Sequence, residues 1–467
     1  MPRGPTGDPW HNLASRPGFL IRRLHQIHLA LFAEECAAFG VTPVQFSLLS
    51  VLAAQPGLDQ AALAFAVGVD RATTANVVTV TVGPGPAAAN GGTYNIPYVS
   101  VKLCRPSTTT CATIDNVLVD TGSSGVRIMA SALAAAGLTL TETQDPNNAS
   151  NSIAECLPFA DGYTFGPIAT ADVSLAGELA SAVSVNIIDD NGSYGAATPN
   201  SCKTVVSSVN TSLNSVQAFA ANGVLGVGIS DQDCGTSCAD CASLSSGCNT
   251  PMSDLYYSCN AGTNSCAFTP VSLSAQVRNP VALFAADNNG VILALEAIPV
   301  AGQTGASGTL TFGIGTQSDN ALGNAFVLTL DSDDNFTTTF DNQSLTGSFI
   351  DSGSNGLFFP DSSIAPCTNT SSNPQASDFY CPTSTLSLMA TNQNQLGATS
   401  VVNFQVSNES TINGTFYADA ALAGPASTTT PLGPYFDFGL PFFYGNRVYT
   451  AIDGKVAGTA IGPFYAY

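Results

Sequence analysis

The stretch Val117-Leu-Val-Asp-Thr-Gly-Ser-Ser-Gly125 has a second version far downstream, Phe349-Ile-Asp-Ser-Gly-Ser-Asn-Gly356. Each version is a short apolar run followed by Asp, a small hydroxyl residue, Gly and Ser. An apolar run of this kind predicts a buried strand, and the Gly and Ser after it predict a tight turn. Each version therefore places one carboxylate, Asp120 or Asp351, where a strand leaves the core.

Two such turns indicate two similar lobes that each contribute one Asp to a shared site. Two carboxyls held together share a proton, because both cannot ionise easily, and the pair can then act as acid and base. This pattern resembles the pepsin-like aspartic protease family, and more specifically an uncharacterised bacterial branch of that fold. The alternative is two unrelated strand-turns in an all-β protein.

The resemblance implies a mainly β, bilobed double barrel that hydrolyses peptide bonds at acid pH, with no cofactor and no metal. In it Asp120 and Asp351 activate a water held between them. The flanking hydroxyl and glycine residues are expected to orient the two carboxylates and to lock the two turns together: Thr121, Gly122, Ser123, Ser352, Gly353 and Ser354.

The same resemblance assigns the lobes and connecting segments of residues 79–467. It implies an N-terminal lobe at 79–297 with a Cys-rich insertion at 230–270, an interlobe linker at 298–308 and a C-terminal lobe at 309–467. The hairpin pattern from Phe159 onward falls where the family has its flap, so the flap aromatic is Tyr163 or Phe159. The segment 222–228 resembles the family's strand behind the first Asp.

Two positions depart from the family pattern. Arg127 stands seven places after the first Asp, where the family has Trp. Behind the second Asp, the apolar-apolar-Gly of the family reads Phe438-Gly-Leu440 or is shifted. These departures bear on the substrate pockets more than on the pair of Asp residues.

Charge and histidine content exclude several classes of partner and of catalysis. The chain carries 12 basic and 33 acidic residues, a net charge of −21, and all of that excess lies after residue 78. Such a surface repels nucleic acid and anionic membranes. The three His residues all precede residue 79, which excludes Ser-His-Asp and Cys-His catalysis from the rest of the chain.

Of 13 Cys, Cys36 stands alone and the other 12 lie between Cys104 and Cys381. This even, dense set predicts disulfides and an oxidising compartment, extracellular or periplasmic. Cys104 with Cys111 and Cys367 with Cys381 are the expected local pairs. The spacing of Cys238 and Cys241 could instead begin a four-cysteine zinc site.

Residues 1–78 differ from the rest and predict helices, among them Val44–Ala54 after Thr42-Pro43 and a third helix from Arg71 to Val78. The segment resembles a truncated MarR-type winged-helix regulator, in which Arg71, Thr73 and Thr74 are the candidate DNA contacts. The family's wing and dimerising helices do not follow, which argues against DNA binding. The alternative is a helical cap packed on the next domain.

No secretion signal is recognised at the N-terminus and no apolar run spans a membrane. Because this conflicts with the cysteine content, we expect a fusion, either natural or an artefact of gene assembly, in which a regulator fragment replaced an export signal. A fusion that exists in the cell implies a cytoplasmic location. Three functions remain: a monomeric endopeptidase acting on peptide or protein substrates, a catalytically idle pepsin-like binding module, and a MarR-type regulator.

Overall fold

A computed structural model of the chain describes residues 32, 43–54, 76–89, 94–204, 211–239, 255–369, 376–426 and 433–467. The chain divides into two compact units, Met1–Thr74 and Ala75–Tyr467. Within the first unit, α3 (Pro43–Ala54) confirms the helix expected after Thr42-Pro43. The other helices expected there, together with Arg71, Thr73 and Thr74, lie outside the described residues.

The predicted third helix is wrong at its end, because Val77 and Val78 begin strand β1 (Val77–Val82). β1 pairs along its whole length with β14 (Ala306–Phe312). The β-branched alternation Val77-Val-Thr-Val-Thr-Val82 suits a strand, and the ladder to β14 decides the conformation.

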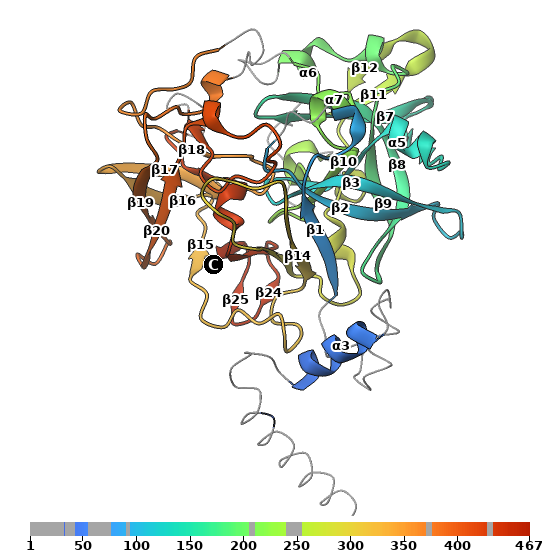
Figure 1. The fold of residues 1–467 in the computed structure, drawn as a ribbon. Coiled ribbons are helices and arrows are strands. Elements are labelled where there is room, and N and C mark those ends of the chain that lie inside the picture. The colour runs from blue at the N-terminus through green and yellow to red at the C-terminus, as the bar shows by residue number, and fades with distance from the viewer. Residues whose placement is uncertain are drawn as a thin grey trace, which may run out of the picture. The chain divides into compact units, whose positions relative to one another are not determined.

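The second unit is mainly β, as the sequence predicts, and most of its strands belong to two sheets (Figure 1). The larger, 17-stranded sheet combines strands from both ends of this unit. Besides β1 and β14 it contains β2 (Pro97–Cys104), β3 (Cys111–Asp120), β4 (Ser124–Met129), β5 (Thr141–Glu142), β6 (Gln144–Asp145), β7 (Asn148–Phe159), β8 (Gly162–Leu175), β9 (Glu178–Ile188), β10 (Gly223–Val227), β11 (Tyr256–Asn260), β12 (Ser265–Phe268), β13 (Gly290–Leu295), β15 (Val327–Thr329), β23 (Arg447–Ala451) and β26 (Phe464–Ala466).

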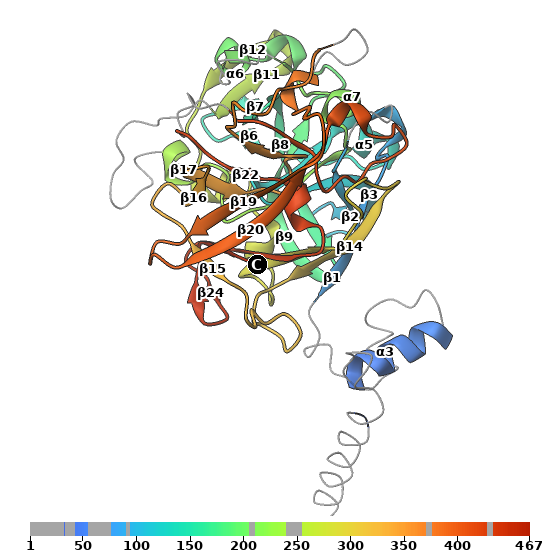
Figure 2. The same ribbon diagram turned by 60° about the vertical axis from the view of Figure 1, so that its left-hand side comes forward.

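The smaller, seven-stranded sheet comes from the C-terminal part alone. Figure 2 shows four of its strands, β16, β17, β19 and β20, side by side. Its strands are β16 (Phe336–Phe340), β17 (Gln343–Ile350), β18 (Leu357–Phe359), β19 (Leu386–Gln393), β20 (Thr399–Val406), β21 (Ala423–Pro425) and β22 (Asp437–Phe438). A separate hairpin pairs β24 (Val456–Ala457) with β25 (Ala460–Ile461).

Helices are few and short among the described residues of this unit. One of them is α5 (Ala130–Ala135), which directly follows β4. Two others, α6 (Asn200–Thr204) and α7 (Val216–Phe219), and several 3-10 turns such as η12 (Leu440–Phe443), occupy connections between strands. None of the helices in the described part of the chain is long and apolar enough to cross a membrane.

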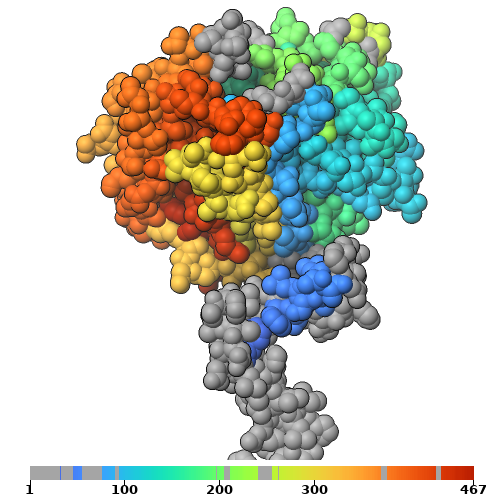
Figure 3. Space-filling model, in the orientation of Figure 1, coloured from blue at the N-terminus to red at the C-terminus, as the bar shows by residue number. Residues whose placement is uncertain are grey.

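The two sheets pack on one continuous apolar core. In the smaller sheet that core is unusually aromatic: the Phe436 ring lies 4.1 Å from Phe438 and 4.9 Å from Phe359 between centroids, and is stacked on both. Figure 3 shows the orange and red residues of the C-terminal part on one side of this unit and the blue to green residues of the N-terminal strands on the other.

The last residues of the expected linker at 298–308 belong to a paired strand. β14 begins at Ala306 and pairs with both β1 and β13. β23 and β26, near the C-terminus, then join the same large sheet through β13. The two ends of this unit are therefore held together by continuous backbone hydrogen bonding.

One local arrangement occurs twice. β10 runs parallel to β3 and antiparallel to β4, so that it lies between them and Gly226 faces Asp120. β22 likewise runs parallel to β17 and antiparallel to β18, and Phe438 faces Ile350. Each of the two Asp turns thus connects two strands that share one central neighbour.

Five disulfides join described cysteines, and they are consistent with an oxidising compartment. The two expected local pairs, Cys104–Cys111 and Cys367–Cys381, are confirmed. The remaining bonds are Cys156–Cys202, Cys234–Cys238 and Cys259–Cys266.

Candidate active site

Asp120 and Asp351 occupy matching places in the repeated arrangement. Asp120 is the last residue of β3, and Asp351 directly follows β17. Each carboxylate accepts a hydrogen bond from the backbone N–H two residues later, Gly122 to Asp120 at 2.8 Å and Gly353 to Asp351 at 2.7 Å. The tight turns that the sequence predicts therefore fold back onto their own carboxylates.

Hydroxyl groups hold the second oxygen of each carboxylate. Ser123 donates to Asp120 Oδ2, and Ser354 donates to Asp351 Oδ2 at 3.1 Å. With both oxygens engaged, rotation of each carboxylate about its χ2 bond is restricted. The serines lie where the sequence analysis expects orienting residues.

Thr121 and Ser352 lock the two turns to each other. The Thr121 backbone N–H donates to Ser352 Oγ at 3.1 Å, and the Ser352 N–H donates to Thr121 Oγ1 at 2.9 Å. Ser352 Oγ also donates to the Val119 carbonyl at 2.8 Å. All three residues are buried, so these bonds are shielded from water and fix the separation of the carboxylates.

Glycine is required at the two contacts between the turns. A Cβ at Gly122 would lie 2.6 Å from Asp351 Cγ, and one at Gly353 would lie 2.7 Å from Asp120 Oδ1. Both distances are far below van der Waals contact. Any side chain at either position would push the two carboxyls apart.

The two carboxyls interact directly. Burial raises the pKa of Asp351 well above its ordinary value, and the charge of Asp120 and a hydrogen bond between the two raise that pKa further. A pair of this kind shares one proton over a wide pH range, and its apparent pKa values belong to the pair rather than to either residue. The site therefore contains an acid and a base at once.

A third carboxyl, Asp437, lies behind the pair, and sequence reasoning missed it. It sits on β22 opposite Phe349, two residues before Asp351, where the other copy of the arrangement has Val224 opposite Leu118. The segment of the second copy that corresponds to Val224-Leu-Gly226 is therefore Asp437-Phe-Gly439, one residue earlier than the expected Phe438-Gly-Leu440. The only sequence signal is an Asp set among aromatic residues at 435–438.

Asp437 is fully buried, and its Oδ1 has no hydrogen-bond partner among the described residues. Burial, which is the largest cause, and the charge of Asp120 raise its pKa to about 8, although the nearby Ser354 hydroxyl opposes the rise. Below that pH the group is a neutral acid. It therefore adds a protonated carboxyl, rather than a charge, beside Ser354.

A cavity of about 330 Å3 opens onto the pair. Its walls include Asp120, Asp351, Gly122 and Ser123, the end of β7 from Leu157 to Ala160, and the segment after β10. Phe159 lines this cavity, close to the tip of the β7–β8 hairpin. Tyr163 does not; it is buried in a separate apolar cluster with Phe165 and Tyr194.

Arg127, seven residues after Asp120, also lines the cavity. Its side chain is fully buried and forms ion pairs with Glu155 at 2.6 Å and Asp233 at 3.2 Å. Tyr256 donates its hydroxyl to Asp233 at 2.8 Å. Arg127 is unusual in the sequence alone, but its partners Glu155 and Asp233 are distant in sequence and are brought to it by the fold.

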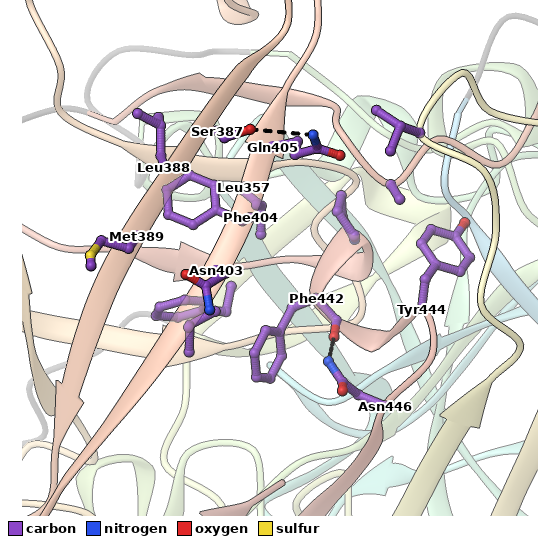
Figure 4. Close-up of a pocket in the computed structure, with 15 residues that line it drawn as sticks. Leu357, Ser387, Leu388, Met389, Asn403, Phe404, Gln405, Phe442, Tyr444 and Asn446 are labelled. Atoms are coloured by element: carbon purple, nitrogen blue, oxygen red, sulfur yellow. Dashed lines mark hydrogen bonds between the residues drawn. The ribbon is translucent and has the colours of Figure 1, made fainter.

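A larger cavity of about 620 Å3 lies between the β19–β20 hairpin and η12 (Figure 4). Its lining contains aromatic, aliphatic and amide side chains but no carboxylate, His, Lys, Arg or Cys. Tyr444 is its one titratable group, and that hydroxyl donates to Asn95. The larger cavity therefore offers no acid–base chemistry, and the smaller one is the better candidate active site.

Among the described residues, one group of side chains has the spacing of metal ligands. It consists of Cys367, Cys381 and Glu409. The two sulfurs are joined in a disulfide, so neither is a thiolate ligand. Cys238, one of the two cysteines of the alternative zinc site, is likewise bonded to Cys234. Its partner in that hypothesis, Cys241, lies outside the described residues.

Residues 72–467 match the family described as "Protein of unknown function (DUF3443)", and the chain belongs to this family. The match begins close to the division between the two compact units and covers all residues of the candidate site. A comparison with curated protein sequences finds no match.

Proposed function

We propose that this protein is an aspartic-type endopeptidase with a bilobed, pepsin-like double barrel, in which Asp120 and Asp351 activate a water. The observation that carries the proposal is the pair of Asp turns joined through Thr121 and Ser352. A chance similarity of two strand-turns would not place their carboxyls within hydrogen-bond reach of each other.

The two carboxyls take complementary roles. Asp120 accepts a proton from a water as the water oxygen attacks the carbonyl carbon of a peptide bond. Asp351, whose pKa burial raises, donates its proton to the carbonyl oxygen, and a tetrahedral diol forms. Collapse of the diol then breaks the C–N bond, with the proton returning from the site to the leaving amine.

The cavity supports a peptide substrate. About 330 Å3 is at the lower end of the range for ligand sites and suits a few side chains at a time. The β7–β8 hairpin, with Phe159 on the cavity wall, is placed to cover a bound chain. The five disulfides support action in the extracellular space or periplasm.

Peptide cleavage by the full-length, oxidatively refolded chain tests the proposal. A peptide library is digested between pH 3 and 7 by the parent and by Asp120→Asn and Asp351→Asn, and products are read by mass spectrometry. Asp115→Asn is the matched control, because Asp115 is an exposed carboxylate on the same strand as Asp120. We expect cleavage by parent and control and a loss of at least about 1000-fold in both site variants.

Cleavage that survives Asp120→Asn would refute the mechanism. A parent that is folded by circular dichroism yet silent at every pH would overturn the proposal in favour of a binding module that keeps the fold without the chemistry.

A further inference from the structure

The cavity beside the catalytic pair has a charged wall that the proposed hydrolysis does not use. Arg127 and Asp233 contribute to that wall, together with the polar side chains of Ser230 and Gln232. The side chains of Arg127 and Asp233 are only 0% and 2% exposed. Buried ionic groups are costly to maintain, and where they line a cleft they mark candidate recognition sites.

Charge around Arg127 does not balance. Glu155 binds the guanidinium in a two-bond fork, at 3.1 Å to Nε and 2.6 Å to Nη2. Asp233 adds a second carboxyl at 3.2 Å from Nη2. One buried cation thus faces two buried carboxyls, and with both ionised the group carries one excess negative charge.

Arg127 cannot serve as an anion receptor. A guanidinium has five N–H donors, and four of them are taken by Glu155, Asp233 and the Ser124 carbonyl at 2.9 Å. An incoming carboxylate would also meet Glu155 and Asp233. The wall is therefore unfavourable to acidic groups.

The protonation of Asp233 decides the net charge of this group. Burial raises the pKa of its carboxyl well above the ordinary value, and the charge and hydrogen bond of Glu155 raise it further. Arg127 and the Tyr256 hydroxyl oppose this rise but do not cancel it. Asp233 therefore keeps its proton to a higher pH than an ordinary carboxyl, and a positive charge placed beside it would favour its ionised form.

We propose that this wall is a specificity subsite for a cationic side chain, so that the protein prefers peptides with Lys or Arg at a residue beside the scissile bond. The inference rests on the proposed function and names its substrate class. A substrate ammonium or guanidinium would supply the second positive charge that this group lacks when Glu155 and Asp233 are both ionised. The net charge of −21 would also attract cationic peptides.

The subsite has a pH signature. Binding of a cation ionises Asp233 and releases its proton, so affinity for a cationic side chain rises with pH until Asp233 is ionised in the free protein. The groups that face Asp233 are Glu155 on β7, Arg127 on β4 and Tyr256 on β11. A neutral side chain of the same length releases no proton and shows no such rise.

Matched peptides that differ at one residue test the subsite. The residue beside the scissile bond is Lys, norleucine or Glu, and the ratio of kcat/KM for Lys over norleucine is measured at pH 4, 5 and 6. We expect a ratio of at least about tenfold at pH 6, as a charge-assisted hydrogen bond provides, with a smaller ratio at pH 4 and the Glu peptide poorest. Asp233→Asn should bring the ratio close to one.

Asp231→Asn is the control. Asp231 is two residues away and pairs with Arg278 at 2.6 Å at the surface, outside the cavity wall, so this variant should keep the parent ratio. Cleavage of the Lys and norleucine peptides at equal rates would sustain the peptidase and refute the subsite. The same refutation follows if the ratio survives Asp233→Asn.

A binding measurement separates the two proposals. Fluorescein-labelled Lys and norleucine peptides are titrated into the Asp351→Asn variant, which needs no turnover. Tighter binding of the Lys peptide, lost on adding Asp233→Asn, supports the subsite even if the parent cleaves nothing and the peptidase proposal falls. Equal binding of both peptides overturns the subsite.

Discussion

Replacing Asp437 by Asn tests the third carboxyl of the site. In the folded protein burial holds the pKa of Asp437 at about 8, whereas an unfolded Asp has its ordinary value of 3.8. Between these two pH values the folded state retains a proton that the unfolded state has lost. The free energy of unfolding therefore falls as the pH rises through that window.

The size of the effect follows from the difference between the two pKa values. At about 1.4 kcal/mol for each pH unit, the upper limit is about 6 kcal/mol between pH 4 and 8. Asp120 and Asp351 share the same buried space, so part of this will be taken up by proton exchange among the three carboxyls. We expect Asp437→Asn to gain at least about 2 kcal/mol over the parent on going from pH 4 to pH 8.

Denaturant unfolding of the full chain at pH 4, 6 and 8, with its disulfides intact, measures this difference. Asp341→Asn is the control, because it removes an exposed carboxylate from the turn between β16 and β17, away from the site. If the parent and Asp437→Asn lose stability in parallel, Asp437 is ionised in the folded protein and the reasoning fails.

Two further substitutions test the geometry of the turns. Ser352→Ala removes the partner of two buried backbone groups and should cost about 2–4 kcal/mol in denaturant unfolding, whereas Ser344→Ala, exposed on the same strand, should cost less than about 0.5 kcal/mol; equal effects would show that the interlocking bonds contribute nothing. Gly439→Ala places a Cβ 2.1 Å from the Gly356 carbonyl oxygen and should cost about 3 kcal/mol or more, while Gly414→Ala, with open space around it, should be nearly neutral. A Gly439→Ala protein as stable as the Gly414→Ala control would contradict the close packing of β22 on its turn.

Much of the site was predictable from local sequence, because local chemistry decides it. In both places an apolar run followed by Asp, a hydroxyl residue and Gly forms a strand and a tight turn, so Asp120 and Asp351 stood out as a matched pair. Cys104 and Cys111 pair across the β2–β3 hairpin, which brings two cysteines a few residues apart together, and that bond was expected. The mainly β architecture followed from strand-like alternation and the scarcity of helical patterns.

Only the tertiary structure decided which distant residues join the site. Strand register put Asp437 at a position that is apolar in the other copy, and burial there, not residue type, sets its pKa. The β7–β8 hairpin likewise put Phe159 on the cavity wall, whereas Tyr163, which pairs with Pro158 across the hairpin, packs in a separate core. The partners of Arg127 come from β7 and the segment after β10, 28 and 106 positions away, and no local pattern encodes contacts at that range.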